Sequence, residues 1–406
     1  MEQQTSQCQR RAALQAIMLG ALSVSCGGMI SGKGTVQQEF CAKPASNITN
    51  TTPITAISAG WTFTAILRDR RVYTWGMNRE GQLGNDTEVF RLRPAKPVEL
   101  NDVIDIVAGG QICIALRGDQ SVWSWGRNTD GELGVINKNN RSTPGQVQGL
   151  PKTRSISSTG SRVAISTEAG DVWAWGALNG LATPKGLLGS NTADIMDTPI
   201  PYTYTPYQVP MSDIITVSAG YTHTLALEKT GKVWAWGANN EGQLGDGTFQ
   251  DSPNPLTIPD LDEVSSISAG DNFSLALKRD GTVWTWGSKL KPESQDNYRP
   301  SQITGLCEIA SISAGGSHMM ALGSGGDIWA LGVNSYGQLG NNTTDNSYQP
   351  LKVSPLRDIV LISAGFHYSL ALQADGTLWA WGNNEFGQLG EGTKQTRLTP
   401  VRILGI

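Results

Sequence analysis

The sequence predicts an all-β fold, a seven-bladed β-propeller of four-stranded blades. Three observations predict it: a tryptophan-rich module that recurs seven times, a Ser-Ala-Gly marker before each module, and a proline-containing strand after it. Four strands in about 50 residues, repeated around a ring, are typical of a propeller. The composition agrees, because glycine is 48 of 406 residues and charged residues are only 16%, as many short strands and glycine turns would require.

The tryptophan module is the most regular part of each repeat. Its fourth copy, Val233-Trp-Ala-Trp-Gly237, has the pattern of a strand that stops at a glycine, and residues 238–245 follow as a glycine-framed turn. Trp234 and Trp236 are two residues apart, so they project from one face of an extended strand. We expect these rings to pack between blades. The other copies begin at Val72, Val122, Val172, Val283, Ile328 and Leu378.

A Ser-Ala-Gly marker, or a relative of it, lies at a near-constant distance before each module. Its glycine precedes the module glycine by 16 or 17 residues in every repeat. An alternating apolar strand leads to the marker and a second apolar strand follows, as in residues 214–220 and 223–227. The marker glycines are Gly60, Gly109, Gly160, Gly220, Gly270, Gly315 and Gly365.

A proline indicates the fourth strand of each unit. These strands are predicted at 94–100, 144–150, 206–209, 255–258, 300–303 and 350–353. The first unit begins at Ile54 with no such strand before it, and the last is followed by one at 400–404. We therefore expect the C-terminal strand to complete the first blade and close the ring, which would remove exposed sheet edges.

The N-terminus has the pattern of a targeting segment. Arg10 and Arg11 precede an apolar run, so residues 1–25 are expected to be a signal peptide. Leu22-Ser-Val-Ser-Cys26 resembles the bacterial lipoprotein signal, which implies lipidation of Cys26. The alternatives are plain secretion and, from the arginine pair, twin-arginine export. Residues 26–52 are expected to be a flexible tether and 53–406 an exported, membrane-anchored propeller, on the periplasmic side or at the cell surface.

The repeats resemble a known family. Residues 220–227, residues 231–237 and Gly242-Gln-Leu-Gly245 together are similar to the regulator of chromosome condensation repeat, and the resemblance covers 54–406. It implies a seven-bladed propeller, but the family's activities are diverse. Nuclear guanine-nucleotide exchange factors of the family use a wedge-like insertion, and no segment matches it. Secreted bacterial members, which include a β-lactamase inhibitor that grips its enzyme with one propeller face, are the nearest analogy.

The residues after the marker glycines are the candidate recognition surface. A turn between the same two strands should place them on one face near the axis, yet their chemistry varies, as on a scaffold that displays a binding surface. The predicted partner-binding face contains Trp61, Arg162, Tyr221, Asp271, Phe366 and His367, since aromatic and arginine side chains are the usual anchors. Ring closure should bring Trp61 close to Phe366 and His367. The alternative is that these are locally packed turn residues.

A secondary contact is predicted in the third repeat. Its long connection runs from Ala177 to Tyr207 and carries Tyr202, Tyr204 and Tyr207 among prolines. The alternative is a solvated loop that packs on its own rim. The fifth repeat deviates in another way, because it lacks the Gly-x-Leu-Gly turn.

Metal and thiol chemistry are not expected. The three histidines, His223, His318 and His367, occupy repeat positions in three different repeats, so they should not converge on an ion. Cys113 and Cys307 fit no zinc motif, and we expect buried free thiols, with a disulfide as the open alternative.

The sequence favours binding over catalysis. A net charge of −4 gives no basic footprint for nucleic acid, and no catalytic motif or cofactor site stands out. We expect a monomeric, non-enzymatic scaffold that binds a protein partner at the bacterial envelope and meets the membrane only through its N-terminal lipid. The alternatives are a glycan-binding or adhesive module, and a hydrolase or lyase with an unrecognised central site.

Overall fold

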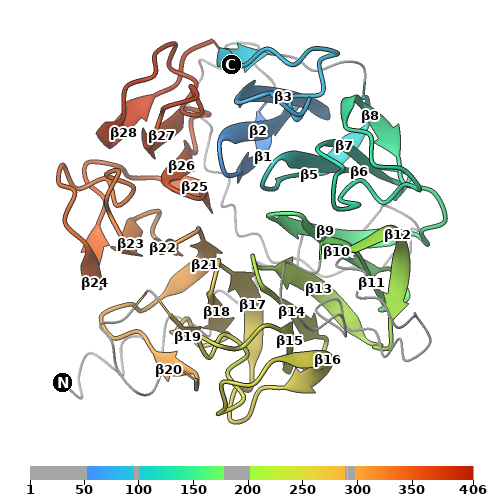
Figure 1. The fold of residues 1–406 in the computed structure, drawn as a ribbon. Coiled ribbons are helices and arrows are strands. Elements are labelled where there is room, and N and C mark those ends of the chain that lie inside the picture. The colour runs from blue at the N-terminus through green and yellow to red at the C-terminus, as the bar shows by residue number, and fades with distance from the viewer. Residues whose placement is uncertain (1–52, 96–99, 178–201, 289, 291–297, 406) are drawn as a thin grey trace, which may run out of the picture. The chain divides into compact units, whose positions relative to one another are not determined.

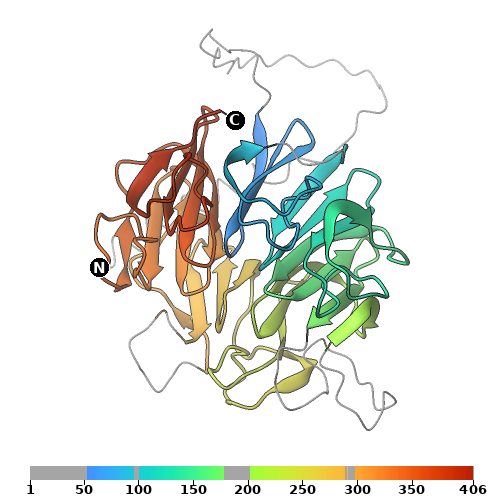
Figure 2. The same cartoon turned by 45° about the horizontal axis from the view of Figure 1, so that its top comes forward.

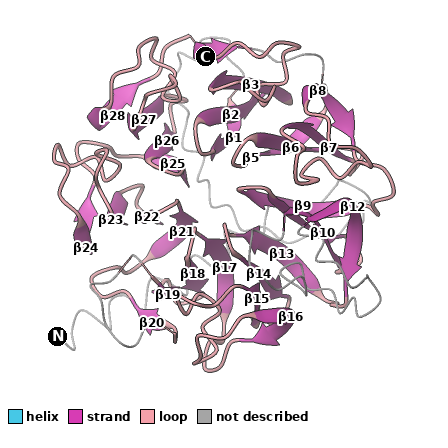
Figure 3. Ribbon diagram, in the orientation of Figure 1, coloured by secondary structure: helices cyan, strands magenta, loops and turns pink. Residues whose placement is uncertain are grey.

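Twenty-eight strands and no helix occur in the residues that the computed structural model describes (Figure 3). The described residues are 53–95, 100–177, 202–288, 290 and 298–405. The strands form seven four-stranded sheets within the unit Ile54–Ile406. The predicted all-β, seven-bladed propeller is therefore confirmed, and its blades are numbered 1 to 7 along the chain.

Each blade contributes one strand to each of four concentric layers (Figure 1). The inner strands are β1 (Ile54–Ala59), β5 (Val103–Ala108), β9 (Thr153–Thr159), β13 (Ile214–Ala219), β17 (Val264–Ala269), β21 (Ile309–Ala314) and β25 (Ile359–Ala364). The second strands are β2 (Phe63–Arg68), β6 (Ile112–Arg117), β10 (Arg162–Thr167), β14 (His223–Glu228), β18 (Phe273–Lys278), β22 (His318–Gly323) and β26 (Tyr368–Gln373). The third strands are β3 (Arg71–Gly76), β7 (Val122–Gly126), β11 (Val172–Ala177), β15 (Val233–Gly237), β19 (Val283–Gly287), β23 (Ile328–Gly332) and β27 (Leu378–Gly382). The outer strands are β4 (Arg91–Ala95), β8 (Arg141–Gln146), β12 (Tyr202–Val209), β16 (Ser252–Thr257), β20 (Ser301–Gln302), β24 (Ser347–Lys352) and β28 (Arg397–Arg402).

Strand direction decides which connections share a face. All neighbouring strands within a sheet are antiparallel, as in the pairs β13–β14, β14–β15 and β15–β16. The turns after the inner strands and the loops after the third strands therefore open on one face, here called the marker face. The turns between second and third strands open on the opposite face, here called the hairpin face (Figure 2).

The core consists of seven hydrophobic clusters, one between each pair of neighbouring blades. Six clusters contain a fully buried tryptophan, the second of the module: Trp75, Trp125, Trp175, Trp236, Trp286 and Trp381. The first ring of the module, as in Trp234, is only partly buried and packs against the same cluster as Trp236. The prediction that these rings pack between blades is confirmed.

The Ser-Ala-Gly marker also joins blades. The Ala219 N–H donates to the Ser157 hydroxyl of the preceding blade at 2.9 Å, and the same bond recurs at five other interfaces. The marker glycine has no room for a side chain, because a Cβ at Gly220 would lie 2.6 Å from the Gly270 carbonyl oxygen and 2.7 Å from His223 Cε1. The marker is therefore an interface motif of the inner ring.

A hydrogen-bonded relay crosses the interface between blades 4 and 5. Trp286 Nε1 and the Ser274 hydroxyl both donate to the Gln243 carbonyl oxygen, each at 2.8 Å. Because the Ser274 hydroxyl proton is used in that bond, Ser274 accepts from His223 Nε2–H, also at 2.8 Å. The interface between blades 6 and 7 repeats this relay with His318, Ser369, Gln338 and Trp381.

The interface between blades 5 and 6 replaces the relay with apolar packing. Leu331 stands where the other modules have their second tryptophan, and Met319 stands in the place of the serine. Leu290 and Phe273 supply the blade 5 side, and all four are buried in one cluster. Blade 5 has no Gly-x-Leu-Gly turn, so the carbonyl oxygen that accepts in the relay is absent. Blade 6 has Leu331 in place of the tryptophan, so the indole N–H that donates to that oxygen is absent as well.

The ring closes without strand exchange, so the predicted completion of blade 1 by the C-terminal strand is wrong. Strand β28 pairs with β27 in blade 7, and blade 1 contains β1 to β4. Each of the seven modules has its own fourth strand, so the last one is not surplus. Closure uses the ordinary interface bonds: Ala59 N–H to the Ser363 hydroxyl at 2.9 Å, and Trp75 Nε1 to the Gln388 carbonyl at 2.9 Å. The C-terminus contributes through Ile403, which is buried in the cluster between blades 7 and 1.

Six of the seven outer strands begin earlier than the proline pattern predicts, and the exception is β20 (Ser301–Gln302), which lies inside the predicted range 300–303. Strand β16 (Ser252–Thr257) contains Pro253 and Pro255 in its interior. Each outer strand pairs on one side only, so a proline can be accommodated where its missing N–H faces away from the neighbour.

Candidate functional site

In five of the seven blades, a backbone N–H of the marker turn donates to a carbonyl oxygen of a neighbouring blade around the axis. The N–H of Trp61 donates to the Gly109 carbonyl at 3.3 Å, that of Tyr221 to Gly270 at 3.2 Å, and that of Phe366 to Gly60 at 3.2 Å. In these blades the residue after the marker place is therefore held at the axial end of the blade on the marker face. We call this the display position.

In blade 3 the marker lies one residue earlier in the sequence than predicted. Arg162 pairs with Thr159 and with Gly176, as His223 pairs with Gly237 in blade 4. Thr159 therefore occupies the marker place of blade 3 and Gly160 its display position. With this alignment the marker lies 176 − 159 = 17 residues before the module glycine, as in five other blades. The display residues are Trp61, Gly110, Gly160, Tyr221, Asp271, Gly316 and Phe366.

Arg162 does not belong to the surface, so that part of the predicted face is wrong. Its side chain is fully buried between blades 3 and 4, where Nη2 donates to the Tyr221 carbonyl oxygen at 3.2 Å. Burial lowers the pKa of its guanidinium to about 10, against the opposing influence of Tyr207 and Tyr221. It fills the place that His223 fills in blade 4, which is an interface position.

Five rings form a continuous row across the marker face. Trp61 lies between Tyr221, at 5.5 Å between ring centroids, and Phe366, at 5.2 Å. Phe366 meets His367 edge-on at 4.3 Å, and His367 stacks on Tyr336 at 4.7 Å. The predicted proximity of Trp61, Phe366 and His367 is confirmed. We call these five side chains the aromatic row.

Glycines at display positions make room for this row. A Cβ at Gly160 would lie 2.9 Å from Tyr221 Cδ2 and 3.4 Å from Trp61 Cζ2, and one at Gly316 would lie 2.7 Å from Phe366 Cδ2. Trp61 of blade 1 can therefore reach Tyr221 of blade 4, because the display position between them in blade 3 carries no side chain. The aromatic row therefore depends on the glycines at some display positions as much as on the rings at others.

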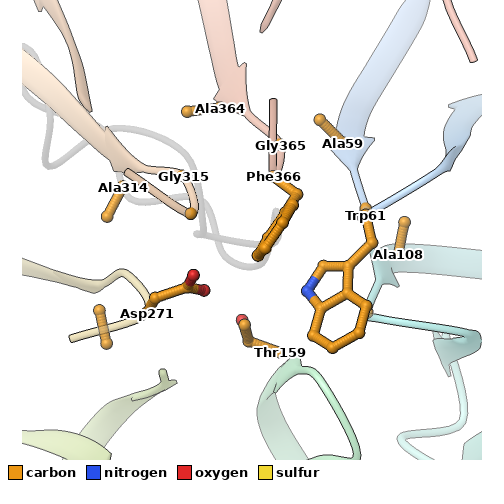
Figure 4. Close-up of a pocket in the computed structure, with 14 residues that line it drawn as sticks. Ala59, Trp61, Ala108, Thr159, Asp271, Ala314, Gly315, Ala364, Gly365 and Phe366 are labelled. Carbon is orange, nitrogen blue, oxygen red and sulfur yellow. The ribbon is translucent and has the colours of Figure 1, made fainter. Parts of the chain in front are cut away.

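A small well opens at the axis beside the row (Figure 4). Trp61, Phe366, Asp271 and Thr159 point into it, and small marker residues such as Ala314 line its wall. Its volume is about 30 Å³, which admits one or two water-sized groups. Asp271 is 6% exposed and is the only carboxylate among the residues that line the well within the described ranges.

The tyrosines of the third repeat do not form a separate contact loop. Residues 202–209 are strand β12, the outer strand of blade 3. Tyr207 packs against the cluster between blades 3 and 4, and Lys138 Nζ lies 5.7 Å from the ring centroid of Tyr204. Tyr202 pairs through its backbone with Ala177, and its side chain lies outside the described residues.

Among the described residues, the histidines and cysteines form no metal-binding group and no disulfide. His223 and His318 are buried, and burial first, then the charge of Arg162 or of His367, lowers the pKa of each to about 3. Among the described residues no group of His, Cys, Asp and Glu is arranged to hold a metal ion. Cys113 is buried and free, whereas Cys307 is free but exposed, so its expected burial is wrong.

The N-terminal predictions lie outside the described residues. Residues 1–52, which include the expected signal peptide, the tether and Cys26, are not among them. Within the described ranges no helix is long and apolar enough to cross a bilayer.

Exposed aromatic side chains gather on the marker face. Those of the described residues are Phe90, Tyr221, Phe249, Tyr336 and Tyr348. Tyr221 is in a marker turn, three others are in loops after third strands, and Tyr348 is the second residue of an outer strand that starts there. The exposed apolar residues of the hairpin face are aliphatic, such as Ile104 and Val360.

The fold and this face define a seven-bladed propeller of about 50-residue repeats with an aromatic marker face. The chain belongs to the family of RCC1-like domains, whose pattern matches residues 182–406. The regulator of chromosome condensation (RCC1) repeat matches residues 69–116 and 119–162, and a second version of that repeat matches 54–82 and 103–132. The family resemblance expected from the repeats is confirmed.

Solved structures with this fold have low sequence identity to the chain. The crystal structure of Kap60 bound to yeast RCC1 (Prp20) matches with a TM-score of 0.72 and 22% identity, over 93% of this chain and 91% of that one. Prp20p from Saccharomyces cerevisiae matches with a TM-score of 0.72 and 23% identity, over 87% and 88%. Human WBSCR16 matches with a TM-score of 0.66 and 21% identity, over 78% and 85%. Because these sequence identities are all below 25%, the similarity to the three structures establishes the fold alone.

Proposed function

We propose that this chain is a non-enzymatic protein-recognition scaffold that binds a partner protein through its marker face. The observation that carries the proposal is the distribution of exposed aromatic rings among the described residues, which all lie at that face and of which Tyr221 and Tyr336 belong to the aromatic row. Aromatic side chains on a rigid frame are typical anchors of protein interfaces. The yeast propeller offers a precedent on the same fold, because Kap60, Gsp1p and histones are the proteins named with it.

The axial well favours binding over catalysis. It is lined by a single described carboxylate, Asp271, whereas general acid–base hydrolysis uses a positioned pair of ionisable groups. Its volume of about 30 Å³ is far below the few hundred cubic ångströms of a typical substrate pocket. The remaining alternative, a glycan-binding module, would use the same rings for stacking and is an outcome of the test below.

We propose further that the scaffold is exported and held at a bacterial envelope by lipid on Cys26. The support is the sequence pattern of residues 1–26, an arginine pair, an apolar run and a cysteine. Metabolic labelling with palmitate should mark the full-length chain, and Cys26→Ala should abolish both the label and membrane partition. Labelling that persists in this variant would contradict the assignment.

The recognition proposal is tested by affinity capture with the immobilised full-length chain. The double variant Trp61→Ala/Phe366→Ala should retain the captured protein at least thirtyfold less well, since interface anchors contribute about 2 kcal/mol or more. The matched control is Ile104→Ser/Val360→Ser, which alters exposed apolar residues on the hairpin face. Equal losses in both variants would contradict binding through the marker face, and retention on a glycan array in place of a protein would favour the glycan alternative.

A further inference from the structure

Three polar groups and one aromatic ring face the axial well from different blades (Figure 4). The indole nitrogen of Trp61 lies on one wall and the carboxylate of Asp271 on the wall across from it. The hydroxyl of Thr159 points into the well between them, and Phe366 forms another side. The well therefore has a donor on one side, an acceptor on the other and a group between them that can be either.

The donor of Trp61 has no acceptor among the described residues. Its Nε1 atom is buried and makes no hydrogen bond there, whereas the Nε1 atoms of five module tryptophans reach a carbonyl oxygen in the preceding blade. Leaving a buried N–H unpaired is unfavourable, so an acceptor brought into the well would stabilise Trp61 in place. Asp271 has the opposite chemistry, because a carboxylate can accept several hydrogen bonds and donates none.

We propose that the well receives the primary carboxamide of an asparagine or glutamine side chain from the partner protein. A carboxamide carries its carbonyl oxygen and its NH₂ group in one plane, and the two point in different directions from the same carbon atom. The carbonyl would accept from Trp61 Nε1–H, and the NH₂ group would donate to Asp271 and to Thr159. This inference rests on the proposed function and narrows the central contact of the partner to one kind of side chain.

Other small polar groups fit the walls less well. An ammonium group can donate to Asp271 but offers no acceptor to Trp61. A carboxylate accepts from Trp61 but is repelled by Asp271. A hydroxyl has a single oxygen, which cannot contact facing walls as a planar amide does. The well volume of about 30 Å³ excludes a whole sugar ring or aromatic ring, because it holds only one or two water-sized groups.

The test uses the full-length chain labelled with ¹⁵N at the tryptophan indoles, with the Trp61 signal assigned by its loss in Trp61→Phe. The probes are propionamide, 1-propanol, propylammonium and propionate, which share an alkyl group and differ in the polar head. Propionamide should shift the Trp61 N–H signal and saturate near ~10 mM, as expected for a ligand of about five heavy atoms. The other three should bind at least tenfold more weakly, and the remaining indole signals should not move.

Variants separate the well from general effects on folding. Asp271→Ala should weaken propionamide binding at least tenfold, and Thr159→Val, which keeps the shape of the side chain, about threefold. The matched control is Asp262→Ala, an exposed aspartate between β16 and β17, which should leave binding unchanged. A stronger response to propylammonium or to 1-propanol, or no response to any probe at 100-fold excess over the protein, would overturn the carboxamide assignment. Because no partner protein is present, this outcome is independent of the capture experiment.

Discussion

Two buried histidines should make the folded ring sensitive to acid. His223 and His318 donate through Nε2 to a serine of the next blade, and each Nδ1 is buried without a hydrogen-bond partner among the described residues. Burial lowers their pKa from 6.5 to about 3 in the folded chain. A group with a depressed pKa contributes stability that is fully present above the unfolded pKa, and this stability is lost as the pH falls from about 6.5 toward 3.

The size of the loss follows from the shift. Each pH unit below 6.5 costs about 1.4 kcal/mol for one histidine, since the unfolded chain takes up the proton and the folded chain does not. At pH 5 the loss is therefore about 2 kcal/mol for each histidine and about 4 kcal/mol for both. This is a large part of the ~5–15 kcal/mol by which folded proteins are usually stable.

The assay is denaturant unfolding of the wild type and of His223→Phe/His318→Phe at pH 8, 6 and 5. Phenylalanine is a suitable replacement because Phe63 and Phe273 occupy the same place in blades 1 and 5. The lost hydrogen bonds should lower the free energy of unfolding by about 1 kcal/mol each at every pH. The variant should then lose about 4 kcal/mol less than the wild type between pH 8 and pH 5. Equal losses in the two proteins would refute the assignment of the acid sensitivity to these histidines.

Four further perturbations test the packing of the blades. Burial raises the pKa of Asp105 from 3.8 to about 6, so the stability that this residue contributes falls as the pH rises from 3.8 through 6. Asp105→Asn should therefore raise the free energy of unfolding by on the order of 1 kcal/mol at pH 8. A gain of the same size at pH 3 would contradict this. Trp286→Leu should lower the free energy of unfolding by about 3 kcal/mol or more. Leu331→Trp should lower it by about 1–3 kcal/mol, because the added ring overpacks the interface. Both are measured by denaturant unfolding, and a stabilising Leu331→Trp would show that the apolar interface has room for the larger ring. Deleting residues 397–406 should speed amide hydrogen exchange first in β27, the partner of β28, whereas earlier exchange in β1 would revive closure by strand exchange.

The seven repeats and their internal order could be predicted from the sequence alone. The pattern Val-Trp-x-Trp-Gly, as in residues 233–237, recurs with fixed spacing, and a fixed spacing determines the local strand, turn and strand order whatever surrounds it. The ring also follows from the repeat, because a blade buries its faces only against its neighbours. The contact of Trp61 with Phe366 could be foreseen for that reason, although 305 positions separate them (366 − 61).

The details of the site were decided by the tertiary structure. In Thr159-Gly160 the glycine of the display position looks like a marker glycine in sequence, and only strand pairing reveals that Arg162 is buried at an interface. The 17-residue spacing from Thr159 to Gly176 is the signal that could have revealed it. The way the ring closes likewise depends on the strand with which β28 pairs. Its sequence is equally compatible with antiparallel pairing to β27 and to β1, and the structure shows pairing to β27.

The aromatic row is the clearest case of a feature that local sequence does not determine. Trp61 and Tyr221 belong to blades 1 and 4, and they meet because Gly160 leaves empty the place that a side chain would fill. The axial well arises in the same way, since Thr159, Asp271 and Trp61 come from three blades and converge only in the closed ring. The sequence by itself determined the repeated frame through local spacing, and the tertiary structure decided the binding surface, because side chains from distant repeats share one small space at the axis.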